Sequence, residues 1–385
     1  MATDGDTSAA DELIQSVDRK ITAIRTKSND FSFNELVDMY DSDELIIDPE
    51  FQRMFRWTEG AQSRFIESLL LELPVPPIFL IEREDRVYEL IDGLQRLSSY
   101  LHFRGELVVD GEKLDPLVLS DCDIVPELNG RTYANLPRAL EIKIKRSYIR
   151  AEILRKESDP RLRYYMFKRL NTGGENLSKQ EVRNATIRLL SNEFNQFLID
   201  LSRNPDFAFV TETLTEKARN EKFDQELILR FFAFKNAGAG YRHDIADFMT
   251  DYMEAVSDPT GPETFDFPSE KATFEKTFRV IKAVGDRLEI GPRIFGTVDA
   301  RTGEPRWQFS VYHYEGIVLG LQKVIDSVEV GNETHVGALA DVVKKGKSDP
   351  AFRAATGGGK NDRISLRTRV SYFSDRFSEA LGALD

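Results

Sequence analysis

Two kinds of hydrophobic repeat divide the chain. Up to about residue 190, helical repeats alternate with short apolar runs typical of strands, whereas beyond that point the repeats are helical and the strand signals fade. The helical repeats of the second part cover residues 192–202, 223–236, 244–256, 270–286, 308–326, 335–344 and 364–382. The pattern predicts an α+β chain, with a tail and helix in residues 1–30, a mixed domain in 31–190 and an all-helical domain in 191–385.

Within the mixed part, local signals place the individual elements. Apolar residues at helical spacing predict a helix that begins after the N-cap Thr58 and ends near Leu73, where Pro74 follows. Asn34 is expected to cap a short helix, and Ser178 with Glu181 forms a capping box. We expect strands at 45–47, 78–82, 86–91 and 148–154, a hairpin at 107–117, and helices at 11–25, 94–101, 137–144 and 160–170.

The most informative stretch is residues 91–97, IDGLQRL. A strand-like run ends on Asp92 and Gly93, and a helix-like run begins at once, so that Gln95 and Arg96 fall in its first turn. A helix N-terminus has unpaired amides and a positive dipole end, which suit an anion. Gly93 permits close backbone approach, and Arg96 carries a donor fork that fits phosphate. The alternative interpretation is a capped helix with a solvated arginine.

Three further segments carry candidate side chains. Gln52, Arg53 and Arg56 are suited to phosphate and base-edge contacts. Glu67, off the apolar face of its helix, is expected to order Arg53 or Arg96 or to help hold a magnesium ion. The turn that ends the 160–170 helix contains Asn171, Thr172, Gly173 and Gly174. Its two glycines allow positive φ angles, and the alternative is a simple helix-ending turn.

These segments together resemble a known domain. The order QR…RW (52–57), ES-LL…LP-PPI (67–78), DG-QR (92–96) and RLNTGG-LS-QE-RNA (169–185) is similar to the N-terminal domain of GmrSD-type modification-dependent restriction enzymes. That domain is ParB/sulfiredoxin-like and is named for a DGQQR signature. The resemblance covers roughly residues 35–190 and implies a small mixed sheet. The chain departs from the signature at Leu94, where the family has its first Gln.

The resemblance also implies a function and its site. It implies binding and hydrolysis of a nucleoside triphosphate with Mg²⁺, in a DNA-targeting restriction or phage-defence system. Asp92 and Arg96 would be catalytic, with Asp92 holding Mg²⁺ or orienting water, and the 171–174 loop would fold back onto this turn. The expected partners are a nucleotide, DNA, and a separate nuclease or modification subunit. The alternative is a non-catalytic subunit that recognises a nucleotide or modified DNA and acts with a separate nuclease.

Composition excludes several other classes. The net charge of −13 argues against non-specific coating of nucleic acid by the whole surface, although residues 138–169 are densely basic. No apolar run has membrane-spanning length, and the acidic start is no signal peptide, so we expect a cytoplasmic protein without membrane contact. The single cysteine, Cys122, excludes an internal disulfide and a cysteine-based zinc site.

Nuclease chemistry has no sequence signal. The four histidines show no paired motif of metal-ligand spacing; they are His102, His243, His313 and His335. The glycine-rich run from Thr356 to Lys360 lacks the first glycine and the Ser or Thr of a phosphate-binding loop, and is interpreted as a mobile loop. The basic residues that follow it, Arg363, Arg367 and Arg369, leave a minor role in binding DNA or phosphate open. We therefore expect no DNA cleavage by this chain alone. The sequence does not indicate the nucleotide or the oligomeric state.

Overall fold

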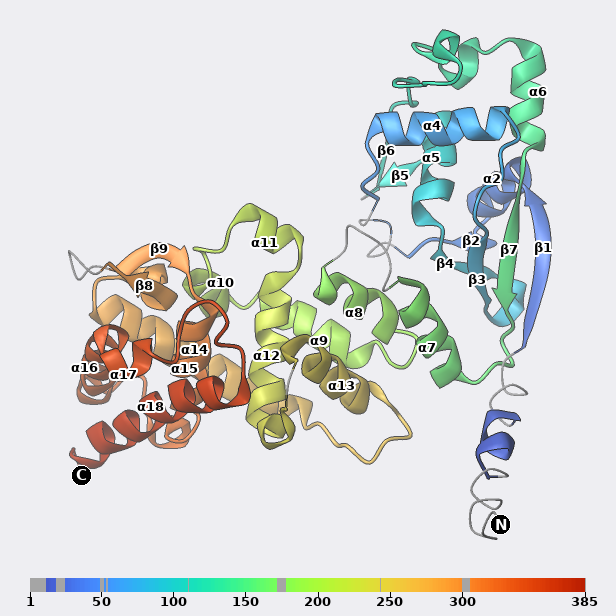
Figure 1. Cartoon of the computed structure of the whole chain (residues 1–385). Coiled ribbons are helices and arrows are strands. Elements are labelled where there is room, and N and C mark those ends of the chain that lie inside the picture. The colour runs from blue at the N-terminus through green and yellow to red at the C-terminus, as the bar shows by residue number, and fades with distance from the viewer. Residues whose placement is uncertain are drawn as a thin grey trace, which may run out of the picture. The chain divides into compact units, whose positions relative to one another are not determined.

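The computed structural model describes residues 12–18, 25–48, 52, 55–109, 111–171, 178–242, 244–299 and 305–384, without the side chains of residues 160, 163, 167 and 171. Contacts divide the chain into two compact units, Met1–Leu177 and Ser178–Asp385 (Figure 1). The first unit combines helices with a mixed sheet and the second is mainly helical, which confirms the predicted α+β class. Among the described residues, no helix is both long and apolar enough to cross a membrane.

A mixed sheet forms the centre of the first unit. Its described strands are β1 (Thr26–Ser32), β2 (Leu45–Ile46), β3 (Ile78–Glu82), β4 (Tyr88–Asp92) and β7 (Tyr148–Leu154), in the spatial order β1-β7-β3-β4-β2. β3 pairs antiparallel with β4 and parallel with β7, while β1 pairs antiparallel with β7 and β2 parallel with β4. The central strands β3, β4 and β7 have buried apolar cores. They fix the strand end at Asp92, from which the next helix departs.

Helices surround this sheet. They are α2 (Phe33–Asp41), α4 (Glu59–Leu70), α5 (Leu94–Arg104), α6 (Arg138–Arg146) and α7 (Pro160–Asn171), and residues 12–18 are also helical. The small hairpin β5 (Val108–Val109) and β6 (Glu112–Lys113) and the short 3₁₀ turns η1 (Glu84–Arg86), η2 (Pro126–Leu128) and η3 (Tyr133–Asn135) complete the unit. Helix α4 packs against α5, and α7 packs against β4.

Most of the predicted elements of this unit are confirmed. Strands β3 and β7 have the predicted bounds, and Thr58 caps α4 by accepting a hydrogen bond from the Ala61 amide (3.2 Å). The α4 helix ends at Leu70 rather than near Leu73, since Glu72 adopts a positive φ of 58°. The expected hairpin at 107–117 and the helix near 137–144 are present.

Two expectations at the start of the unit were wrong or incomplete. The N-cap of α2 is Ser32, whose hydroxyl accepts from the Glu35 amide, so Asn34 lies inside the helix instead of capping it. Strand β1 was not predicted, because its residues are mostly polar and it pairs at the edge of the sheet with β7 alone. Residues 11 and 19–24 of the expected first helix lie outside the described residues.

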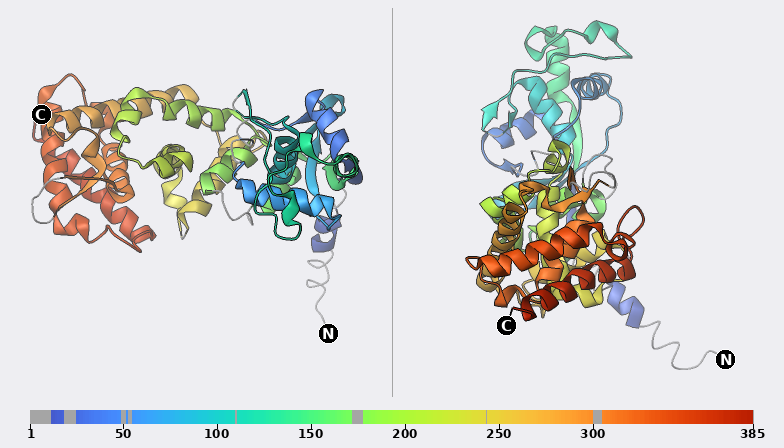
Figure 2. Two further views of the ribbon diagram at one scale, coloured as in Figure 1. Left: turned by 90° about the horizontal axis from the view of Figure 1, so that it is seen from above. Right: turned by 90° about the vertical axis from the view of Figure 1, so that its left-hand side faces the viewer.

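The second unit contains a helical array with an aromatic core. Its helices are α8 (Lys179–Ile187), α9 (Glu193–Ser202), α10 (Pro205–Val210), α11 (Glu216–Asn220), α12 (Phe223–Ala237), α13 (Ile245–Ser257), α14 (Phe267–Arg287), α15 (Val311–Leu321), α16 (Glu333–Ser348), α17 (Pro350–Arg353) and α18 (Arg363–Gly382). The short turns are η4 (Gly238–Gly240), η5 (Gly291–Phe295) and η6 (Ile325–Ser327). Phe231, Phe274 and Phe278 are fully buried, and α15 and α16 both pack against α18 (Figure 2).

The expectation of an all-helical second domain requires a correction. Strands β8 (Gly296–Val298) and β9 (Pro305–Phe309) form an antiparallel hairpin. The first strand has only three residues and the second exposes its central residues, so neither shows the alternation that identifies a strand. The hairpin forms part of a cavity described below.

One buried ionic cluster ties three helices of this unit together. Glu315 of α15 lies between Arg230 of α12 and Arg369 of α18, and its side chain is 1% exposed. Arg369 donates from Nε to the Glu315 carboxylate (2.7 Å), and from Nη1 to the carbonyls of Ala355 (3.2 Å) and Lys360 (2.8 Å). The same guanidinium therefore fixes both ends of the glycine-rich loop at 356–359.

We predict that Glu315→Gln lowers the free energy of unfolding by about 3–5 kcal/mol, because the substitution removes the carboxylate partner of the buried Arg369 and leaves Arg230 with Glu226 alone. Urea unfolding followed by circular dichroism measures the change. The control Glu379→Gln, an exposed residue of α18, should unfold at the wild-type midpoint. Equal midpoints for both variants would show that the cluster does not stabilise the unit.

Candidate functional site

The turn between β4 and α5 forms the centre of the candidate site. Gly93 has φ +103°, and a Cβ atom at this position would overlap Cγ2 of Ile78. Only glycine fits here, because both the backbone angle and the space exclude a side chain. Gly93 is also the N-cap of α5 and provides no side-chain cap for the helix. The first amides of α5 therefore receive no capping oxygen from Gly93, as an anion site at a helix start requires.

Arg96 is fixed beside this turn. Its Nη2 donates to Oδ2 of Asp92 (2.9 Å) and to the carbonyl of Pro77 (3.1 Å). The Arg96 side chain is 16% exposed and the Asp92 side chain 33%, so the pair lies at the surface of the unit with the arginine more deeply set. Within the described part of the chain, Nε of Arg96 is buried and has no acceptor. The guanidinium thus keeps donor capacity beyond its pair with Asp92.

Gln95 connects the turn to the upstream polar segment. Its Oε1 accepts hydrogen bonds from the backbone amides of Arg56 and Trp57, both at 3.0 Å. The Trp57 ring packs edge-on against Phe65, which supports a core role for the tryptophan. The described contacts of Gln95 give its side-chain carbonyl a positioning role, and the contact of Gln95 with a nucleotide stays a prediction.

The structure brings two of the three predicted segments together. Gln52 donates from Nε2 to the carbonyl of Val108, and Arg56 is an exposed residue next to the Gln95 contact. Helix α7, which ends at Asn171, packs against β4, which ends at Asp92. Arg53, Thr172, Gly173, Gly174 and the Asn171 side chain lie outside the described residues, so the third segment stays a prediction.

Glu67 and Leu94 lie close to the turn and have defined surroundings. The Oε1 atom of Glu67 accepts from the amides of Ile124 (3.1 Å) and Val125 (2.6 Å), and the side chain is almost fully buried. Glu67 thus anchors this loop, and no described contact joins it to Arg96. Leu94, where the chain departs from the DGQQR signature, is 4% exposed and belongs to the core of the unit. The departure therefore adds to the packing of α5.

Residues that sequence reasoning did not single out complete the turn. Pro77 contributes the carbonyl that accepts from Arg96, and Ile78 contributes the methyl group that excludes a side chain at residue 93. Both belong to the LP-PPI motif, which therefore packs directly against the DG-QR motif. The sequence indicated this contact only through the order of the motifs, because the residue type does not show which backbone carbonyl will accept a hydrogen bond.

Cysteine and histidine chemistry has no place at this site. Burial, followed by the nearby Glu67 carboxylate, raises the pKa of the Cys122 thiol to about 11, so the reactive thiolate is disfavoured. Both ring nitrogens of His102 are engaged, one by Gln62 Oε1 (2.8 Å) and one by the Asp115 carbonyl (2.9 Å). Among the described residues, no group of three or more His, Cys, Asp or Glu could hold a metal ion.

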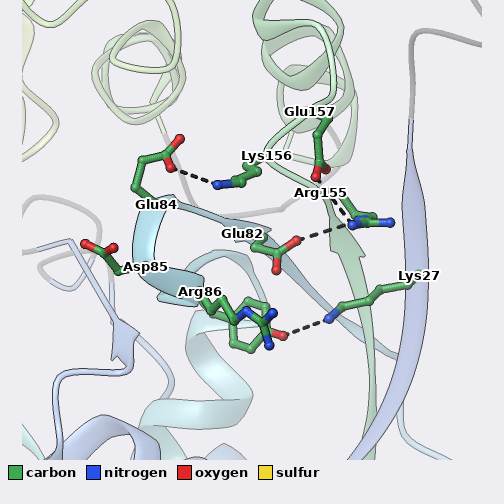
Figure 3. A pocket seen from close by; sticks show the side chains of 9 residues that line it. Lys27, Glu82, Glu84, Asp85, Arg86, Arg155, Lys156 and Glu157 are labelled. Atoms are coloured by element: carbon green, nitrogen blue, oxygen red, sulfur yellow. Dashed lines mark hydrogen bonds and ion pairs between the residues drawn. The ribbon is translucent and has the colours of Figure 1, made fainter.

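The basic stretch at 138–169 is largely balanced by carboxylates. Arg138 and Lys145 pair with Glu141, and Arg150 pairs with Asp30. Figure 3 shows the same balance in a cavity of about 630 Å³ beside the sheet, where Lys156 binds Glu84 (2.9 Å) and Arg155 lies between Glu82 and Glu157. This cavity offers no net charge of one sign and carries no argument for an anionic ligand.

Comparison with known proteins agrees with these motifs. Residues 33–188 match the family model described as GmrSD restriction endonuclease, N-terminal domain. This segment, which contains the β4–α5 turn and its packing partners, is therefore a domain of that family. No curated protein and no solved structure matches the chain.

We predict that Gln95→Leu makes amide exchange at Arg56 and Trp57 about fivefold faster, because each amide loses a hydrogen bond worth roughly 1 kcal/mol. Gln95→Glu is the matched control, since it keeps an acceptor at the same distance along the side chain. Hydrogen exchange measured by mass spectrometry compares the three proteins. Wild-type exchange in the leucine variant would mean that Gln95 does not hold this segment.

Proposed function

We propose that the β4–α5 turn binds a nucleoside triphosphate and that the chain hydrolyses it with Mg²⁺, as one component of a restriction or phage-defence system. The family match supports the system, because the matched domain is the N-terminal domain of a restriction endonuclease. The chemistry rests on the turn itself. Phosphoryl transfer requires mainly positioning and charge stabilisation, which such a turn provides.

The single observation that carries this proposal is the fixed Arg96 guanidinium at an uncapped helix start. Arg96 is oriented by Asp92 and by the Pro77 carbonyl, and its buried Nε has no acceptor among the described residues. A buried donor without a partner costs free energy, and a phosphate oxygen would satisfy it. The amides of Gly93, Leu94 and Gln95 would add neutral donors to the same anion.

Mg²⁺ fits this turn as part of a metal–nucleotide complex. The ion is usually held by one or two carboxylates together with substrate phosphates, rather than by a cage of protein ligands. Arg96 engages Oδ2 of Asp92, which leaves Oδ1 of the same carboxylate for a hard cation. When bound, the ion would neutralise phosphate charge. Asp92 also keeps Arg96 in position.

We predict that Arg96→Ala weakens triphosphate binding about ten- to hundredfold, the loss expected for one charge-assisted hydrogen bond of roughly 1.5–3 kcal/mol. Titration calorimetry with ATP and GTP measures it. Arg131→Ala is the matched control, because Arg131 is an exposed arginine in a loop of the same unit. The phosphate site would have to be sought elsewhere if both variants bound equally well.

We predict that Asp92→Asn lowers the rate of triphosphate hydrolysis about a hundredfold, because the amide keeps the shape of the side chain but removes its charge. Release of inorganic phosphate in the presence of Mg²⁺ measures the rate. Asp123→Asn, an exposed carboxylate of the same unit, should retain full activity. The purified wild type should leave plasmid DNA intact under the same conditions.

Two results would overturn the enzymatic proposal. Unchanged hydrolysis in Asp92→Asn would exclude a role of this carboxylate, and plasmid linearisation that depends on Asp92 would make the turn a nuclease site. Full binding without any hydrolysis would favour the second candidate function.

That second candidate is a non-catalytic subunit that recognises modified DNA. A groove of about 810 Å³ in the first unit favours this candidate, because it adjoins the β4–α5 turn through Pro77, whose carbonyl accepts a hydrogen bond from Arg96. Tyr148 and Arg146 also line the groove; Tyr148 is 68% exposed, and Arg146 is exposed as well. DNA binding that is independent of nucleotide and is lost in Tyr148→Ala would support this function.

A further inference from the structure

The second unit contains a cavity of about 510 Å³ that is unrelated to the β4–α5 turn. It is formed by the β8–β9 hairpin, the start of α15, the end of α16 and the segment that follows α17. Its lining residues are Thr297, Val298, Arg306, Gln308, Phe309, Ser310, Val311, Tyr312, His313, Lys347, Arg353, Thr356 and Gly357. Three of them are cationic and none is a carboxylate, although the protein as a whole carries a net charge of −13.

Lys347 is the most unusual member of this set. The residue is 3% exposed, and its Nζ donates to the carbonyls of Ile294 (2.9 Å) and Arg293 (3.3 Å). An ammonium group has three protons, so these two acceptors leave one donor for a ligand. Burial, followed by repulsion from Arg293, lowers the pKa of Lys347 to about 7, and an anion beside Nζ would restore the charged form.

His313 supplies an independent sign that a polar ligand is missing. The residue is 4% exposed, and Nδ1 shares a hydrogen bond with Ser310 Oγ (2.9 Å). Within the described part of the chain, its Nε2 is buried without a partner. Buried polar atoms are almost always satisfied in folded proteins, so an orphaned nitrogen at a cavity wall indicates an absent partner.

The remaining walls provide charge and aromatic surface. Arg353 is exposed and has no ion pair or side-chain hydrogen bond among the described residues. Arg306 pairs with Asp299 (2.9 Å), which lies outside the lining. Phe309 and Tyr312 offer apolar ring surface on the same cavity. The adjoining glycine-rich loop is held at both ends by Arg369, and nothing lies near the positions that Cβ atoms of Gly357 and Gly359 would occupy.

We propose that this cavity binds a small phosphorylated ligand with an aromatic body, such as a nucleoside monophosphate. The volume is several times that of a phosphate group, and the rings of Phe309 and Tyr312 suit a base or another flat group. Arg306, Arg353 and Lys347 would bind the phosphate, and Nε2 of His313 would bind a polar edge of the ligand. The glycine-rich loop would let the ligand approach its backbone closely.

Titration calorimetry with AMP, inorganic phosphate and adenosine tests this proposal on the full chain. AMP should bind more tightly than phosphate or adenosine alone. Arg353→Gln should weaken AMP binding about ten- to hundredfold, as expected for one charge-assisted hydrogen bond. Lys345→Gln is the matched control, because Lys345 is an exposed cation of α16, the helix that carries Lys347.

The histidine resonances locate the ligand. The ring signal of His313, assigned from the His313→Gln variant, should shift on addition of AMP, whereas the signal of His102 in the first unit should not. Arg96→Ala should leave this shift unchanged. A failure of the cavity proposal can therefore be distinguished from a failure of the proposed triphosphate site. The proposal would be overturned if the His313 signal did not shift on addition of AMP, if AMP and adenosine bound equally well, or if Arg353→Gln bound AMP as tightly as the wild type.

Discussion

The first unit depends on one steric constraint: there is no room for a side chain at Gly93. The chain must change from a buried strand to a helix within one residue, with a positive φ angle and with Ile78 filling the place of a side chain. This close contact sets the start of α5 against β3. It therefore also sets where Arg96 meets the Pro77 carbonyl and where Gln95 meets the amides of Arg56 and Trp57. Three polar contacts thus depend on the absence of a Cβ atom at one residue.

The parts of the fold that sequence predicted best are those with strong local signals. Strand β3 is an apolar run preceded by prolines, and β7 alternates polar with apolar residues. Thr58 and the Ser178–Glu181 box mark helix starts by side-chain chemistry. Strand β1 lacks such a signal, because an edge strand that exposes alternate residues can be built from polar ones. Its pairing with β7 joins residues more than a hundred positions apart, which no local pattern records.

The candidate sites also differ in how far the sequence could predict them. The β4–α5 turn was found because Asp92, Gly93 and Arg96 are neighbours in sequence and their spacing reflects one strand end and one helix turn. The contacts of Gln95 and Glu67 with backbone amides could not be predicted from the sequence, because residue types do not reveal backbone partners. The cavity of the second unit had no motif, since its members extend from Thr297 to Gly357 and meet only through packing.

Charge distribution gives the two units different chemistry. In the first unit nearly every described basic side chain of the 138–156 stretch has a carboxylate partner, so Arg96 is distinguished by its place at a helix start rather than by local net charge. In the second unit the buried Glu315 carboxylate forms ion pairs with Arg230 and Arg369. Arg369 of that cluster also holds the glycine-rich loop beside the cavity, whose lining includes Lys347, Arg353 and Arg306 and no carboxylate. The cavity therefore has a cationic lining in a protein whose net charge is −13.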